Sequence, residues 1–238
     1  MKKQQILDNG QQKLSISKKS SLLLLCKALH NKGSSAPSKN TYVNVEIPSN
    51  TVLRADIEEV EEKELFDDLD SVEWAKEAIL TLAEKGIISG RGNNKFDPNG
   101  TVTREEFVKM IVGAAGLYDS SAKSDFADVA PGSWYESYVA SAVNNGLVKG
   151  QGEKMFGVGQ PITRQDVCVI ASGILNGEFN GELSFNDNDK ISDYAKESVR
   201  KLTASGVVSG MGDGSFMPLS TCTRAQAAKI IYGILERR

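Results

Sequence analysis

The 238-residue chain contains a single histidine, His30, and only three cysteines, which form no Cys-x-x-Cys pair. Histidine supplies many of the general bases and metal ligands of proteins, so its scarcity argues against histidine-based catalysis and a histidine-ligated metal. Cys168 and Cys222 occupy positions that are apolar in the other copies of the repeat described below. We therefore expect both to be core residues rather than metal ligands or disulfide partners, and we expect no cofactor and no enzymatic activity.

Long apolar runs are absent too. The leucine run Leu22–Leu25 is shorter than the apolar region of about 7–15 residues in a signal peptide. It is also far shorter than the roughly 20 apolar residues that cross a bilayer as a helix. The sequence therefore predicts no membrane insertion, and residues 1–30 show no export signal.

Charge of one sign is not in large excess. The net charge of −3 predicts no general attraction to nucleic acid. The charge is unevenly distributed, however, because residues 1–45 contain eight lysines and one acidic residue, whereas residues 46–70 contain ten acidic and two basic residues. A lysine-rich terminus of this kind is usually solvated and disordered.

Residues 1–65 are interpreted as a linker arm that could also be the end of an upstream domain. Residues 1–40 are rich in Lys, Gln and Ser, and we expect them to be mostly disordered. The alternation of apolar and polar residues over 42–47 predicts a strand, and Val52-Leu53 is a candidate for a second one. Residues 54–64 are interpreted as an acidic connector.

A 60-residue repeat dominates the rest of the chain. The segment Thr103-Arg104-Glu105-Glu106 recurs as Thr163-Arg164-Gln165-Asp166 and as Thr223-Arg224-Ala225-Gln226. The same step relates Trp74, Trp134 and Tyr194; Gly86, Gly146 and Gly206; Gly90, Gly150 and Gly210; and Phe96, Phe156 and Phe216. A fixed period held by several residue types predicts one supersecondary unit used three times.

Each copy of the repeat predicts two helices joined by a long loop. In the first copy, apolar residues at helical spacing predict a helix from about Val72 to Lys85, and Gly86 supplies its C-cap. A second helix is expected after Thr103, and the pattern recurs in both later copies. The sequence thus predicts an all-α domain of three tandem helix–loop–helix repeats. The three repeats span residues 66–120, 121–180 and 181–238.

The loop between the two helices carries recurring glycine and phenylalanine residues. Loops longer than about 12–15 residues are uncommon unless they are functional or disordered. The phenylalanines are expected to plug the core, and the glycines permit a positive φ or the close approach of a ligand. The loop glycines are Gly92, Gly152 and Gly212. We therefore expect a binding groove where each loop meets the N-terminus of the second helix.

The Thr-Arg-x-x segments have a local interpretation at the start of each second helix. Thr followed three residues later by Glu, Asp or Gln is a capping box. This places Arg104, Arg164 and Arg224 at the first helical position, where side chains usually face solvent. A cation at this position interacts unfavourably with the helix dipole. Its presence in all three copies therefore indicates that the arginine has a functional role. An arginine beside free helix N–H groups can bind a carboxylate or phosphate. The alternative is that each arginine pairs with a carboxylate of a neighbouring repeat.

Two further patterns have a structural explanation as well as a functional one. Trp74, Trp134 and Tyr194 stand at the start of each first helix, where they can either stack on sugars or seal the helix onto the core. Lys95–Glu106 has the spacing of an EF-hand calcium loop, but a lysine occupies the first ligand position and the later copies lack the acidic residues. We therefore expect no metal site.

A known family combines these features. In the second copy, the residues that match the motifs of this family are Phe126-Ala127-Asp128-Val129, Trp134, Gly146-Leu147-Val148-Lys149-Gly150 and Thr163-Arg164-Gln165-Asp166. These segments, with their counterparts in the other copies, resemble the S-layer homology module. The resemblance covers residues 66–238.

The resemblance implies an all-helical domain in which three repeats pack around a pseudo-threefold axis. It also implies non-covalent attachment of a surface protein to secondary cell-wall polysaccharide, whose ketal-pyruvylated, anionic sugar lies in grooves between the repeats. By this resemblance the arginines are the main contacts, and aromatic and glycine residues flank them. The contacts carried over are Arg104, Arg164, Arg224, Trp74, Trp134, Tyr194, Gly92, Gly152 and Gly212.

The resemblance also predicts location and partners. The protein is expected to be extracellular, at the cell wall or S-layer with other surface proteins, as a fragment or the C-terminal part of a larger exported protein. Departures such as Gln165-Asp166, Gln226 and Tyr194 predict unequal grooves, with Arg104 the most costly arginine to lose. Loss of an arginine is expected to weaken binding without unfolding the domain. The competing interpretation is a helical protein-interaction module that binds an acidic peptide or protein.

Overall fold

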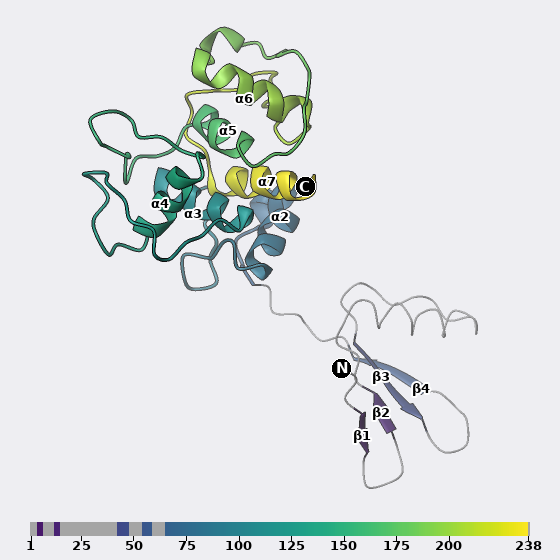
Figure 1. Ribbon diagram of the computed structural model, residues 1–238. Helices are drawn as coiled ribbons and strands as arrows, with labels where there is room; N and C mark the ends of the chain where they lie inside the picture. Colours follow the sequence, from purple (N-terminus) through teal and green to yellow (C-terminus); the bar gives the residue numbers. More distant parts are fainter. Residues whose placement is uncertain (1–3, 7–11, 15–41, 48–53, 59–64, 238) are drawn as a thin grey trace. The chain divides into compact units, whose positions relative to one another are not determined.

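The computed structural model describes residues 4–6, 12–14, 42–47, 54–58 and 65–237. The chain divides into two compact units, Met1–Glu64 and Leu65–Arg238, which are considered separately (Figure 1). Among the described residues, no helix is both long enough and apolar enough to cross a bilayer.

The described part of the first unit is a four-stranded antiparallel sheet with the strand order β1-β2-β3-β4. Its strands are β1 (Gln4–Ile6), β2 (Gln12–Leu14), β3 (Tyr42–Ile47) and β4 (Arg54–Glu58). The strand predicted at 42–47 is confirmed as β3.

The other three strands of this unit were not predicted. β1 and β2 lie in the stretch expected to be mostly disordered, and β4 lies in the presumed acidic connector. β1 and β2 have three residues each, too few for a recognisable alternation. β2 also pairs with β3, which is distant in the sequence. The candidate strand at Val52-Leu53 lies outside the described residues, as does the rest of the arm.

The second unit contains six α-helices within residues 65–237, two in each repeat, as predicted. The first helices of the repeats are α2 (Glu73–Glu84), α4 (Glu136–Asn144) and α6 (Asp193–Ala204). The second helices are α3 (Arg104–Ala115), α5 (Arg164–Ser172) and α7 (Arg224–Leu235). Two 3₁₀ turns, η1 (Asp70–Val72) and η2 (Asn188–Lys190), precede α2 and α6.

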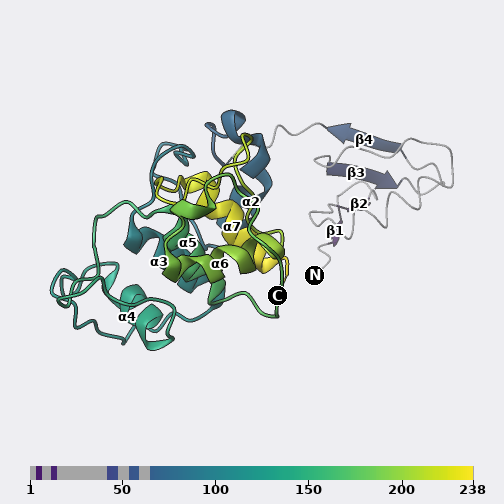
Figure 2. The ribbon, with the colours of Figure 1, turned by 90° about the horizontal axis from the view of Figure 1, so that it is seen from above.

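The helices pack as a closed ring. The first helix of a repeat contacts the second helix of the preceding repeat, so that α4 packs on α3 and α6 packs on α5. The ring closes because α2 of the first repeat packs on α7 of the last, and these two helices lie side by side in both ribbon views (Figures 1 and 2). The second helices α3, α5 and α7 also contact one another. This arrangement confirms the pseudo-threefold domain.

Backbone hydrogen bonds tie the three repeats together just before the second helices. The Val102 N–H donates to the carbonyl of Cys222 (3.1 Å), the Ile162 N–H to Val102 (2.9 Å) and the Cys222 N–H to Ile162 (2.9 Å). The three residues are buried and occupy equivalent positions in the repeat. Each repeat therefore depends on the other two for its backbone pairing, as expected of a closed ring and not of an open solenoid.

The loop phenylalanines plug the core as predicted, and an aspartate in each repeat holds the loop in place. Phe96, Phe156 and Phe216 are fully buried. The Asp128 carboxylate accepts hydrogen bonds from the N–H groups of Phe156, Gly157 and Val158 at 2.7–2.9 Å. The anchors in the other repeats are Asp68, which binds the N–H groups of Phe96 and Asp97, and Asp187, which binds those of Phe216 and Met217. The recurring Phe-x-Asp segment at the start of each repeat therefore serves the loop.

Cys168 and Cys222 are buried, free thiols. Burial raises the pKa of each thiol to about 12, so both are neutral near pH 7. The expectation that they are core residues is confirmed.

Candidate binding grooves

The three arginines of the Thr-Arg-x-x segments are buried, contrary to the expectation that they face solvent. Arg104 is 8% exposed, and Arg164 and Arg224 are each 7% exposed. The sequence argument considered one helix by itself, whereas in the closed ring the start of each second helix is covered by the loop of another repeat. The arginines are therefore part of the junctions between repeats.

Each arginine contacts backbone carbonyls and a phenylalanine of the next repeat around the ring. Nε of Arg164 donates to the carbonyl of Phe216 (2.8 Å), and its guanidinium carbon lies 5.1 Å from the centre of that ring. Nε of Arg224 donates to the carbonyl of Phe96 (2.8 Å) and Nη2 to that of Ser89 (2.8 Å). The hydrogen-bond partners of these arginines are carbonyls, not the carboxylates that the structural alternative supposed.

Arg104 sits differently in its junction. Its Nη2 donates to the carbonyl of Lys149 (3.0 Å), and its guanidinium carbon lies 5.0 Å from the centre of the Phe156 ring. Its buried Nε has no hydrogen-bond partner among the described residues. Arg104 and Arg164 thus each make one side-chain hydrogen bond, whereas Arg224 makes two.

The first two N–H groups of α5 and of α7 already donate to carbonyls of a loop from another repeat. The N–H of Arg224 donates to the carbonyl of Gly100 (2.9 Å), and that of Ala225 to Pro98 (2.9 Å). In α7 the Thr223 hydroxyl accepts from the Gln226 N–H (3.3 Å), and the Gln226 side chain accepts from the Thr223 N–H (3.1 Å). The predicted capping box is thus present in α7, and the first two N–H groups of α5 and of α7 are not free to bind an anion. A ligand at these junctions would meet side chains instead.

One groove, called here the Arg164 groove, combines all three repeats. It is a cavity of about 350 Å³ that takes Trp74 from the first repeat, Arg164 from the second, and Gln226 and Lys229 from the third. Residues 207–212, including the predicted Gly212, complete its lining. The structure thus brings together predicted residues that lie far apart in the sequence.

The Arg224 groove has the same plan, moved one step around the ring. It is a cavity of about 380 Å³ that takes Trp134 from the second repeat, Arg224 from the third, and Glu106 and Lys109 from the first. Residues 87–91 complete its lining, so Gly92 lies just beyond it. Two ion pairs hold the Arg91 side chain in this wall, one with Glu106 (3.1 Å) and one with Asp97 (3.3 Å).

At the junction that contains Arg104, called here the Arg104 site, polar side chains of the protein bond to one another. The Tyr194 hydroxyl donates to Oδ1 of Asp166 (2.8 Å) and accepts from Nε2 of Gln165 (2.9 Å). Burial lowers the pKa of Arg104, and the negative charge of Asp166 opposes this shift. The electrostatic partner of Arg104 at this site is thus a carboxylate of the protein.

Two lysines in the grooves were not predicted from the sequence. Lys109 and Lys229 line the Arg224 and Arg164 grooves, and both stand five residues after a Thr-Arg-x-x arginine on the second helix. The equivalent residue at the Arg104 site is Val169. The sequence does contain a signal for them, because a lysine occupies the same repeat position in two of the three copies. Lysines on a helix surface are common, however, so this signal alone does not indicate a site.

The predicted aromatic residues present open surface. Trp74, Trp134 and Tyr194 are 52%, 53% and 59% exposed, so about half of each side chain is not used in sealing the core. Nζ of Lys109 lies 5.5 Å from the centre of the Trp134 ring. An exposed ring beside two cations can bind a ligand that has both an apolar face and a negative charge.

The loop glycines have two different roles. Gly92 and Gly152 have φ angles of 97° and 95°, which favour glycine. At Gly210, by contrast, an added Cβ would lie 2.8 Å from the Ser215 carbonyl and 2.9 Å from the Phe185 ring. The close approach that requires glycine there is made by the protein itself, not by a ligand.

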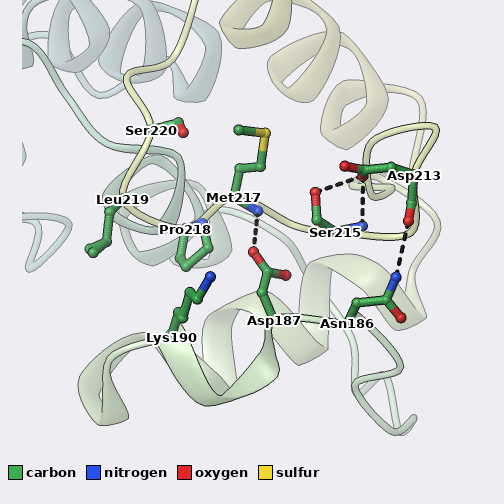
Figure 3. Close-up of a pocket in the computed structure, with 9 residues that line it drawn as sticks. All are labelled: Asn186, Asp187, Lys190, Asp213, Ser215, Met217, Pro218, Leu219 and Ser220. Atoms are coloured by element: carbon green, nitrogen blue, oxygen red, sulfur yellow. Dashed lines mark hydrogen bonds between the residues drawn. The ribbon is translucent and has the colours of Figure 1, made fainter.

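A further cavity, of about 430 Å³, lies beside η2 and contains none of the predicted site residues. Figure 3 shows its polar groups bonded to the loop: the Asp187 carboxylate accepts from the Met217 N–H (2.9 Å), and Asp213 accepts from the N–H and hydroxyl of Ser215 (2.9 and 2.7 Å). These contacts support the loop that carries Phe216. We therefore conclude that the polar residues lining this cavity serve to hold the loop in place.

Comparison with known proteins agrees with the repeat pattern. The family model of the S-layer homology domain matches residues 65–108, 125–168 and 184–228. Exoglucanase XynX of Acetivibrio thermocellus is 33% identical over 208 residues, which are 84% of this chain and 19% of that protein. S-layer protein sap of Bacillus anthracis is 30% identical over 174 residues, which are 70% of this chain and 20% of that protein.

The Surface-layer 125 kDa protein of Lysinibacillus sphaericus is 29% identical over 167 residues, which are 68% of this chain and 14% of that protein. The chain thus spans about a fifth or less of the length of these three relatives. The printed names of these relatives describe an exoglucanase and two surface-layer proteins.

Proposed function

Because the chain belongs to the S-layer homology domain family and is an anchoring module of the cell-wall surface, we propose that it binds an anionic secondary cell-wall polysaccharide without a covalent bond. The ligand group we propose is a pyruvylated sugar, which carries a carboxylate on an otherwise neutral ring. The observation that carries the proposal is the composition of the Arg164 and Arg224 grooves. Each combines a half-exposed tryptophan, a buried arginine and a lysine from three different repeats.

The chemistry of the grooves suits such a sugar. A carboxylate bound by Lys109 and Arg224 makes charge-assisted hydrogen bonds, which are about twice as strong as neutral ones. The loop carbonyls of Ser89 and Phe96 already fix the Arg224 guanidinium, so little side-chain entropy is lost on binding. The exposed Trp134 ring offers an apolar surface for the C–H face of the sugar. The groove can therefore recognise charge and ring together.

The three junctions are not expected to contribute equally. The Arg164 and Arg224 grooves each have a tryptophan and a lysine, whereas the Arg104 site has Tyr194 and Val169. Asp166 also places a negative charge near Arg104, where a ligand carboxylate would be repelled. We therefore propose two principal grooves and a weaker third site, an order that differs from the sequence-based expectation that Arg104 matters most.

The runner-up function is the binding of an acidic peptide or surface protein, since the same cations would attract one. The aromatic residue in each groove favours a sugar, because a peptide carboxylate has no need of an adjacent flat apolar surface. We also infer that this chain attaches rather than catalyses, and that it is part of a larger exported protein, in keeping with relatives that extend well beyond the repeats.

The test is a sedimentation assay with purified cell walls, before and after chemical removal of the secondary polysaccharide. We expect the protein to bind intact walls and to lose binding when the polymer is removed. Soluble polysaccharide should compete, and polyglutamate of similar charge should not. Equal binding to stripped walls, or equal competition by polyglutamate, would reject the polysaccharide in favour of a protein or general polyanion ligand.

A further inference from the structure

An exposed pair of tyrosines lies beside the Arg224 groove. Tyr118, just after α3, stacks on Tyr138 of α4 with ring centres 4.3 Å apart and an angle of 28° between the rings. Tyr118 is nevertheless 49% exposed, so a large part of its surface faces solvent. This is more open aromatic surface than helix packing needs.

The tyrosine pair is continuous with the groove. Nζ of Lys109, a groove residue, lies 5.5 Å from the centre of the Trp134 ring and 6.0 Å from that of Tyr138. Trp134 lies in the turn just before α4, and Tyr138 lies in the first turn of that helix. Trp134, Tyr138 and Tyr118 therefore form one strip, called here the aromatic strip, which leads away from the groove. Tyr135 packs edge-on against Trp134 at 5.2 Å and holds the start of the strip.

The strip is not required by the repeat. The residues that correspond to Tyr138 in the other copies are Ala78 and Ser198, and Glu178 corresponds to Tyr118. The helix pairs α5 with α6 and α7 with α2 pack without a counterpart of the tyrosine stack. A role in α3–α4 packing alone leaves the exposure of Tyr118 unexplained.

We propose that the aromatic strip is a subsite for the sugar that follows the anionic residue along the polymer. This inference rests on the proposed function, because Arg224 and Lys109 must first hold the carboxylate. The next unit then lies over Tyr138 and Tyr118, whose rings bury the C–H face of a neutral pyranose and whose hydroxyls can bond its hydroxyls. The Arg224 groove thus reads a longer stretch of polymer than the Arg164 groove does.

The test compares ligands of different length. One-sugar and three-sugar fragments bearing the pyruvyl group, prepared from purified wall polymer, are titrated calorimetrically into the full chain. Lys229→Gln is present throughout to weaken the Arg164 groove. Tyr118→Ser should weaken binding of the three-sugar fragment roughly 3- to 10-fold, the size expected for one lost ring contact. It should leave the one-sugar fragment unchanged, and Tyr118→Phe should be close to wild type.

Each outcome decides a separate point. The subsite is rejected, while the proposed function stands, if Tyr118→Ser leaves the affinity for both fragments unchanged or lowers both affinities equally. The reference is the Lys229→Gln protein that keeps Tyr118. If even the Tyr118 protein binds neither fragment, the proposed function itself fails. If Tyr118→Ser lowers the thermal midpoint, the subsite is tested instead by the NMR chemical shifts of the Tyr118 ring protons in the protein that keeps this tyrosine. Tyr118 signals must then move with the three-sugar fragment and not with the one-sugar fragment.

Discussion

The Arg164 and Arg224 grooves and the Arg104 site are built from equivalent positions of one repeat, yet they differ in charge and access. In the two grooves an arginine and a lysine face a cavity beside a half-exposed tryptophan. At the Arg104 site a valine replaces the lysine, and Tyr194 is bonded to Asp166. The backbone of the repeat thus supplies the junction, and we propose that three side chains decide whether it suits an anion.

The largest expected effect is the loss of a buried arginine. Arg224→Ala leaves the carbonyls of Ser89 and Phe96 without their donors, at a cost of about 1–3 kcal/mol each. The unfolding free energy should fall by about 2–6 kcal/mol, and the midpoint by roughly 4–24 °C. Arg104→Ala, which removes one such bond, should lower the midpoint less. Equal midpoints in calorimetry would contradict this difference between the junctions.

The groove lysines offer a test of binding that leaves the junctions intact. Lys109→Gln and Lys229→Gln each remove a cation from a groove and no hydrogen bond to the loops. Loss of one charge-assisted contact should weaken binding to intact walls roughly 10-fold per groove, without a change in thermal midpoint. Lys85→Gln, an exposed lysine outside both cavities, is the matched control. Binding that is unaffected by both groove variants would remove the lysines from the site.

The loop of the second repeat, which builds the Arg104 site, should be the most sensitive to acid. Desolvation raises the pKa of Asp128, but its three backbone N–H donors outweigh this and lower the pKa below the ordinary 3.8. The stability from these bonds is therefore present above about pH 4 and is lost as the pH falls through the lowered pKa.

Asp128→Asn should cost about 1 kcal/mol at pH 7. Because the substituted residue does not titrate, the variant should lose less stability than wild type on acidification below pH 4. Thermal midpoints at pH 7 and pH 3 check both statements. A wild type and a variant with parallel pH profiles would show that Asp128 does not titrate as described.

The smallest expected effect, and the most direct test of the comparison, is a gain of binding. The substitutions Val169→Lys, Tyr194→Trp and Asp166→Gln together copy the side chains of the Arg164 groove onto the Arg104 site. Calorimetry with the one-sugar fragment should then change from two sites per chain to three. A stoichiometry that stays at two would show that the backbone of this junction, and not these side chains, determines whether the sugar can enter it.

Much of the fold could be predicted from local sequence patterns and from the comparison of the three copies. The 60-residue period, the C-cap glycines and the apolar helix faces predicted six helices in three repeats, and the structure has them. The burial of the loop phenylalanines and of Cys168 and Cys222 followed from alignment of the copies. The family itself was evident from the same residues. These features follow from a residue pattern that the sequence repeats three times.

The tertiary structure decided what lies between the repeats. Arg224 bonds to Ser89 and Phe96, 135 and 128 residues away, so its burial could not be inferred from the capping of one helix. The meeting of Trp74, Arg164 and Lys229 likewise depends on ring closure, whereas the pairing of Tyr194 with Asp166 depends on the packing of α6 on α5. The pairing of β2 with β3 in the first unit is also non-local. Local propensity specifies each repeat, whereas the contacts that define the grooves exist only after α2 has packed on α7.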